Sequence, residues 1–160
     1  MEKFFIALIL SFNLYASEVL FINETDEFTD EVELVLAVTS DDSNTIISKV
    51  VGAYCTTGID EPYLLFNNGG LYTIDNYRTA TFRFDKNEPY EQKFRVINNQ
   101  LIALGKDPVN RFLNNLEKSE SFVAKIEKVK GVLRFSKYGE VDSKVKNFRT
   151  AISELSKCNL

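Results

Sequence analysis

Short segments of alternating apolar and polar residues, separated by turn-forming residues, constrain the fold of this chain more than any other feature. The clearest segment is 77–85, where strand-forming Thr, Phe and Tyr predominate and no Gly or Pro interrupts. Successive side chains of a strand point to opposite faces. Phe82 and Phe84 therefore share one face, and Thr81 and Arg83 share the other. This pattern predicts a protein built mainly from β-strands.

Further strands are expected wherever the same alternation recurs. The segments are 31–40, 45–57, 63–66, 71–74, 91–97, 121–129 and 132–138. In segment 31–40, Val35 and Ala37 are apolar on the face opposite Leu34 and Leu36, which indicates burial on both faces. The turn 67–70 (Asn-Asn-Gly-Gly) favours a hairpin, because Asn and Gly tolerate positive φ.

Two segments follow a helical period instead. Asp107 and Pro108 are typical of a helix start, with Asp as cap and Pro in the first position. The second helix is expected from about Asp142 or Ser143. The two apolar stripes are Val109, Phe112, Leu113 and Leu116, and Val145, Phe148, Ile152 and Leu155.

About eight strands and two helices are thus expected, without β-α-β alternation or an internal repeat. The predicted architecture is an antiparallel β-sandwich or open barrel closed by the C-terminal helix.

The N-terminus is typical of a secretory signal peptide over residues 1–16. Lys3 gives a positive start, 4–10 is an apolar run, and Ala16 is a small residue at the expected cut. A membrane anchor or a buried first strand is the alternative, but the run is shorter than the roughly 20 residues that span a bilayer. We expect a periplasmic or secreted chain without a stable membrane span. Residues 17–30 then form a polar, edge-lying or mobile lead-in, and 31–160 form a single β-rich domain.

The chain has two cysteines, Cys55 and Cys158, and an oxidising compartment favours their pairing. Strand alternation directs Cys55 inward together with Val51. Continuing the C-terminal helical stripe by three residues directs Cys158 inward as well. We therefore predict a Cys55–Cys158 disulfide, with two independent buried thiols as the alternative.

The composition argues against most chemical sites. The chain has no His, which removes the commonest general base and a common metal ligand, and its net charge of −4 gives no footprint for nucleic acid. The adjacent carboxylates of Asp41 and Asp42 lack the further ligands of a calcium loop. We therefore expect no metal and no cofactor, and we expect the chain not to be an enzyme.

The best carboxylates for a hydrolase would be Asp85 with Glu88 or Glu91. They lie in and around a charged turn, where solvation is their ordinary role. Arg83 lies two residues from Asp85, so a structural ion pair of Arg83 with Asp85 is favoured over ligand binding; Glu91 is its other possible partner.

The order of features resembles the VasI/TagO-like family of exported accessory proteins associated with type VI secretion clusters. The matching pieces are the acidic segment 26–30, the Cys55 strand, Arg83-Phe84-Asp85 before an acidic-Pro turn, Phe112 to Leu116 in a helix, and Cys158 after a terminal helix. The family has Arg-Cys at 54–55, usually a Trp near 94, and a Phe-Asp-x-x-Gly segment that 135–139 keeps only in part.

The resemblance implies an exported, non-enzymatic accessory protein whose partner is another protein of the cell envelope or secretion apparatus. An inhibitor or immunity-type protein that binds an exported hydrolase is the alternative, and a cell-wall hydrolase comes third.

Overall fold

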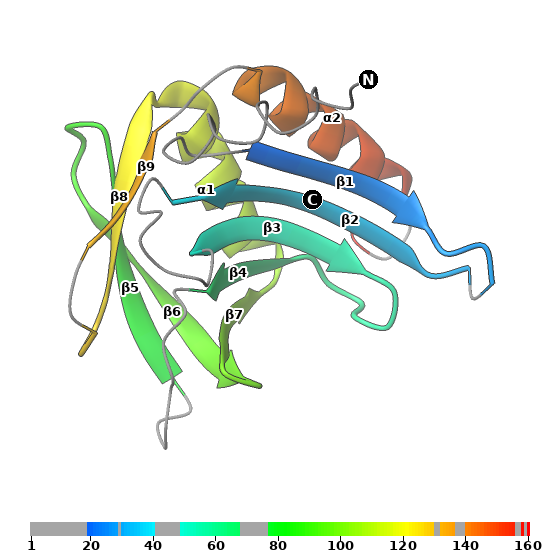
Figure 1. Cartoon of the computed structure of the whole chain (residues 1–160), viewed down its shortest axis with the longest axis horizontal. Coiled ribbons are helices and arrows are strands. Elements are labelled where there is room, and N and C mark those ends of the chain that lie inside the picture. Colours follow the sequence, from blue (N-terminus) through cyan, green and yellow to red (C-terminus); the bar gives the residue numbers. More distant parts are fainter. Residues whose placement is uncertain are drawn as a thin grey trace, which may run out of the picture.

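The computed structural model describes residues 19–28, 30–40, 49–67, 77–129, 132–136, 140–155, 158 and 160. Within these residues, nine strands form one sheet, and two helices lie against one face of it (Figure 1). The elements are β1 (Val19–Thr25), β2 (Val32–Thr39), β3 (Val50–Thr56), β4 (Tyr63–Asn67), β5 (Tyr77–Phe84), β6 (Tyr90–Ile97), β7 (Gln100–Leu104), α1 (Lys106–Lys118), β8 (Ser121–Ile126), β9 (Leu133–Ser136) and α2 (Val141–Glu154).

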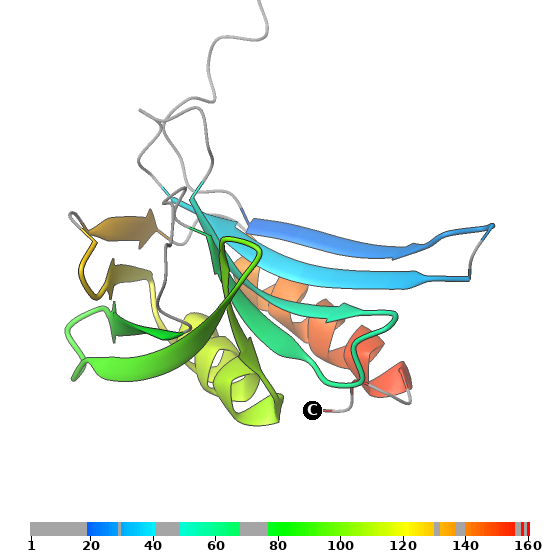
Figure 2. The same cartoon turned by 90° about the horizontal axis from the view of Figure 1, so that it is seen from below.

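The sheet has the strand order β1-β2-β3-β4-β7-β6-β5-β8-β9, and all neighbouring strands are antiparallel. Figure 2 shows it bending, so that β5, β6, β8 and β9 stand at an angle to β1, β2 and β3. Among the described strands, β1 and β9 are the outer ones, and the sheet does not close into a barrel. The prediction of a mainly antiparallel β fold with a packed C-terminal helix is confirmed, as a single open sheet.

The core lies between the sheet and the helices. Phe82, at the centre of β5, is completely buried. Its ring centroid lies 5.4–6.5 Å from those of six aromatic neighbours, which are Phe66, Phe84, Tyr90, Phe94, Phe112 and Phe122. The expected inward row of β2 is also buried, with Leu34 opposite Cys55 and Leu36 opposite Ala53 in β3. These rings and aliphatic rows join both parts of the bent sheet into one core.

The opposite face of β2 is buried too, as its apolar sequence predicts: Val35 and Ala37 are 3% and 2% exposed. Ala37 lies opposite Gly52 of β3, where the two strands approach closely. A Cβ atom at Gly52 would lie 2.5 Å from the backbone oxygen of Leu36 and 2.7 Å from the Cα of Ala37. Glycine at this position therefore permits the close pairing of β2 and β3.

Both helices bury the predicted stripes except Leu155, which follows the end of α2 and is partly exposed; Val109 and Phe112 in α1 and Val145 and Phe148 in α2 are fully buried. Contacts place α1 against β3 and β4, and α2 against β1 and β2. Between the helices, Arg149 donates to Asn114 Oδ1 at 2.7 Å and to Asn110 Oδ1 at 3.3 Å, and it pairs with Glu117 at 3.5 Å.

The start of α1 differs from the prediction. Its N-cap is Gly105, with φ of 104°, and Asp107 lies in the first turn without a side-chain cap hydrogen bond. The backbone N–H of Gly105 donates to the carbonyl oxygen of Pro62 at 2.8 Å, which fixes the chain one residue before the helix. Asp107 still places a negative charge where the helix dipole favours it.

Several strand boundaries also differ from the prediction. The expected lead-in contains β1, an edge strand paired with β2. Residues 100–104, which are not among the predicted strands, form β7, joined to β6 through Asn98 and Asn99 with φ of 47° and 64°. The expected signal peptide 1–16, strand 71–74 and the Asp41-Asp42 turn lie outside the described residues.

Candidate interaction surface

The disulfide between Cys55 and Cys158 is present, with the two Cα atoms 6.1 Å apart. It joins positions 103 residues apart in sequence, and both cysteines are at most 4% exposed. Cys158 lies beyond the end of α2, so it does not continue the helix as the apolar stripe predicts. Its backbone N–H instead donates to the carbonyl oxygen of Leu155 at 3.3 Å. The bridge thus fixes the C-terminal segment to β3.

Next to the disulfide, Thr57 fixes the base of the loop that joins β1 to β2, where Thr25 pairs with Val32. Its Oγ1 accepts a hydrogen bond from the backbone N–H of Val32 at 2.6 Å. Its own backbone N–H donates to the carbonyl oxygen of Val32 at 3.0 Å. Leu34, two residues further along β2, pairs with Cys55, so the base of this loop is held by hydrogen bonds and lies close to the disulfide.

The hairpin projects from the body of the protein (Figures 1 and 2) and ends in a loop closed by its own backbone. The N–H of Asp26 donates to the carbonyl oxygen of Glu31 at 2.8 Å, and the N–H of Asp30 donates to that of Asp26 at 2.9 Å. Asp30 adopts φ of 55°, as the tight loop requires. Asp26 Oδ1 also accepts from the N–H of Phe28 at 2.7 Å, which positions the backbone of Phe28.

Phe28 lies at the tip of this loop with 97% of its surface exposed. The other exposed large apolar side chains of the described residues, Leu20, Tyr77, Leu104 and Val132, are 36–53% exposed. Isolated surface apolar residues are ordinary, but they usually keep part of their surface against the protein. Phe28 instead exposes its side chain to solvent, while its backbone N–H is held by the hydrogen bond to Asp26.

Acidic residues flank Phe28 in the sequence. Segment 24–33 contains six of the chain's 23 acidic residues and none of its 19 basic ones. Glu24 of β1 and Glu33 of β2 are directly opposite each other, an arrangement of like charges that is unfavourable for strand pairing. An open depression of about 400 Å³ lies along this end of the hairpin, lined by Glu24, Thr25, Asp26, Glu31, Val32, Glu33, Thr56 and Thr57.

The carboxylates considered for hydrolysis have a different setting. Asp85 follows the end of β5 with φ of 47°. Its carboxylate accepts hydrogen bonds from the backbone N–H of Ser121 at 2.9 Å and of Glu120 at 3.1 Å, which fixes the start of β8. Glu88 and Glu91 are exposed. Hydrogen bonding to the backbone is a structural role for Asp85, while its ion pair with Arg83 stays a prediction.

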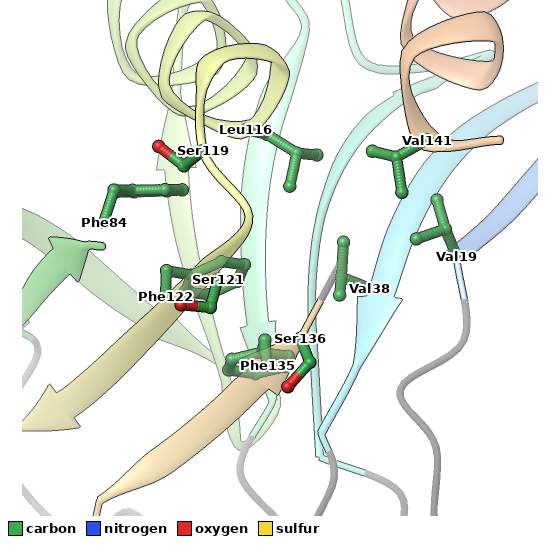
Figure 3. A pocket seen from close by; sticks show the side chains of 10 residues that line it. All are labelled: Val19, Val38, Phe84, Leu116, Ser119, Ser121, Phe122, Phe135, Ser136 and Val141. Atoms are coloured by element: carbon green, nitrogen blue, oxygen red, sulfur yellow. The ribbon is translucent and has the colours of Figure 1, made fainter. Parts of the chain in front are cut away.

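A small cavity lies where the ends of β1 and β2 approach β8 and β9 (Figure 3). Its volume is about 10 Å³, enough for about one water molecule. Most of its lining is apolar, with the hydroxyl groups of Ser119, Ser121 and Ser136 beside it. A space of this size is a packing defect of the core and does not accommodate an organic ligand.

Within the described part of the chain, His, Cys, Asp and Glu form no group of three or more that could hold a metal ion. Neither of the helices in this part has the length and apolar character that crossing a bilayer requires. Comparison of the chain with protein-family models, curated proteins and solved structures finds no match.

The hairpin tip as a surface is the feature that sequence reasoning missed. The sequence identifies segment 26–30 as acidic, but its pattern predicts no contact role for Phe28. The available signal was a single Phe among acidic residues, without apolar residues two positions away to form a strand face. Such a residue has no place in a core, but only the structure shows that it ends a projecting hairpin.

Proposed function

We propose that this chain is an exported, non-enzymatic binding protein that recognises another protein through the tip of the β1–β2 hairpin. The observation that carries the proposal is the 97% exposure of Phe28 on a loop held by backbone hydrogen bonds. Burying an aromatic ring against a partner is favourable, and aromatic residues are enriched at the centres of protein interfaces. The hydrogen bond that holds the backbone N–H of Phe28 also reduces the conformational entropy lost when the residue binds.

The Cys55–Cys158 disulfide and the signal-like N-terminus support a periplasmic or secreted location. In that compartment, the partner is a protein of the cell envelope or of a secretion apparatus. A role beside type VI secretion is the specific form of this proposal, and it rests on the resemblance of the sequence to the VasI/TagO-like family.

A narrow projecting hairpin favours one second candidate, an inhibitor or immunity-type protein that binds an exported hydrolase. Its tip would enter a cleft on the hydrolase, because a single ordered loop fits a concave site better than a flat one. A hydrolytic activity of the chain itself is less well supported, since the Asp85 carboxylate bonds to the backbone N–H groups of Glu120 and Ser121.

The test is photo-cross-linking in the source cells. A photoreactive phenylalanine analogue replaces Phe28 in one variant and Tyr77 in the control, because Tyr77 is an exposed aromatic residue on a different strand, β5. Both variants should be exported at equal levels. A discrete covalent adduct with another protein is expected from position 28 and not from position 77. Equal adduct patterns at both positions, or none at position 28, would contradict the proposal.

A further inference from the structure

Given the proposed function, the chemistry of the hairpin tip also defines its partner. We infer that the partner is a protein with an apolar pocket for the Phe28 ring, surrounded by Lys and Arg side chains. The exposed ring supplies the apolar anchor. Glu24, Glu27 and Glu33, all exposed, give this end of the hairpin a negative charge.

The arrangement of these charges excludes a wholly apolar pocket. Glu24 and Glu33 lie directly opposite on neighbouring strands, so both carboxylates face the same side of the hairpin. A pocket without charged groups would remove their water and return no compensating interaction, which costs free energy for each buried carboxylate. Basic side chains at the rim would instead offset that cost through charge-assisted hydrogen bonds.

The same charges argue against other kinds of partner. A nucleic acid or an anionic lipid surface would be repelled by a tip with acidic residues and no basic ones. A second copy of this chain, joined tip to tip, would bring two such clusters together. A basic protein remains as the complementary partner, and electrostatic attraction would accelerate its association at low ionic strength.

The position of Glu24 opposite Glu33 is consistent with a role in binding. Two like charges at paired positions weaken the hairpin relative to a neutral pair. Replacing one of them should therefore stabilise the fold while it weakens binding. Groups kept only for folding would show the opposite relation.

The experiment combines the photoreactive residue at position 28 with charge removal. The tip variant carries Glu24→Gln, Glu27→Gln and Glu33→Gln. The control variant carries Glu88→Gln, Glu91→Gln and Glu154→Gln, which lie elsewhere on the surface and change the net charge by the same amount. The adduct yield is measured in extracts of the exported fraction at about 50 mM and about 500 mM NaCl, because the higher salt concentration screens exposed charges.

We expect the adduct yield of the tip variant to be at least about tenfold lower than that of the parent at low salt, and the yield of the control variant to be unchanged. High salt should lower the yield of the parent and have little further effect on the tip variant. Mass spectrometry should place the cross-link in a partner segment rich in Lys and Arg.

Equal yields in the two variants, or a cross-linked segment without basic residues, would overturn the inference while leaving the proposed function intact. The absence of any adduct at position 28 would overturn both.

Discussion

Phe28 and Phe82 show how differently one residue type is used in this chain. Phe82 is completely buried among six aromatic rings, whereas Phe28 is 97% exposed. The neighbouring residues explain the difference. Phe82 shares one apolar face of a strand with Ala80 and Phe84, and Phe28 lies among acidic residues in a turn. An aromatic residue without an apolar row is therefore a better indicator of a contact surface than aromatic content.

The first prediction compares these two residues. Phe28→Ala should leave the free energy of unfolding within about 0.5 kcal/mol of the parent, because the ring makes almost no contact with the protein. Phe82→Ala should lower it by about 3–5 kcal/mol, because it creates a cavity at the centre of the core. Urea unfolding followed by circular dichroism measures both. A large loss in Phe28→Ala would show that the ring packs against the fold and is not a free anchor.

The second prediction concerns Gly52. Gly52→Ala should destabilise the protein by about 1–3 kcal/mol, because the added Cβ would meet the backbone of Leu36 and Ala37. The clash is with main-chain atoms, so the double variant Gly52→Ala/Ala37→Gly should not recover stability. Recovery in the double variant, measured by thermal melting, would show that the Ala37 side chain and not the backbone limits the space.

At the scale of elements, the sequence predicts side-chain direction better than it predicts boundaries. Alternation placed Phe122 and Ala124 of β8 inward, and both are buried. The start of α1 was predicted too late, because a side-chain cap at Asp107 was expected where the positive φ of Gly105 makes the turn. Boundaries depend on such backbone geometry and on tertiary contacts, which a periodic pattern does not contain.

The hairpin surface was beyond prediction for a similar reason. Segment 26–30 could be identified as acidic, but the exposure of Phe28 depends on the length over which β1, β2 and β3 pair before the loop begins at the Thr25–Val32 pair, where Thr57 bonds to Val32. Strand pairing sets that length, and pairing is a long-range property. The disulfide was predictable, because export chemistry and two independent side-chain directions indicated the same pair.

The third prediction tests the disulfide as the tie between β3 and the C-terminal segment. Replacing both cysteines by Ala should lower the free energy of unfolding by about 2–4 kcal/mol, through release of a loop that spans 103 positions. Hydrogen exchange should increase first in the last turn of α2, while Val32 at the base of the β1–β2 loop keeps its bond to Thr57. Increased exchange at Val32 before α2 would show that the bridge mainly supports the hairpin.

At the scale of the whole molecule, two partly buried tyrosines link stability to alkaline pH. Burial, together with smaller contributions from the neighbouring Tyr63 and Glu33, raises the pKa of Tyr54 from an ordinary 10.0 to about 12. The rings of Tyr54 and Tyr63 stack with their centroids 5.4 Å apart. Burial also raises the pKa of Tyr90, an effect that the guanidinium of Arg111, 3.9 Å from the ring centroid, partly opposes.

The fourth prediction follows from the sign of these shifts. Above pH 10 the unfolded chain loses the phenolic protons while the folded chain keeps them, so the folded state binds more protons and stability falls as pH rises. For Tyr54, the loss should run from about pH 10 to about pH 12 and be absent below that range. Tyr54→Phe should flatten this decline, because its ring has no proton to release, and Tyr90→Phe should act in the same direction.

Urea midpoints measured between about pH 9 and pH 12 give this slope, with Tyr77→Phe as the control because Tyr77 is about half exposed, at 53%. The difference between each variant and the parent isolates one tyrosine from the lysines that titrate in the same range. Equal slopes in all variants would show that Tyr54 and Tyr90 ionise as readily in the folded chain as in the unfolded one. The region around Tyr54, between β2 and β4, would then be open to water. The loop that carries Phe28 would therefore lack a rigid base.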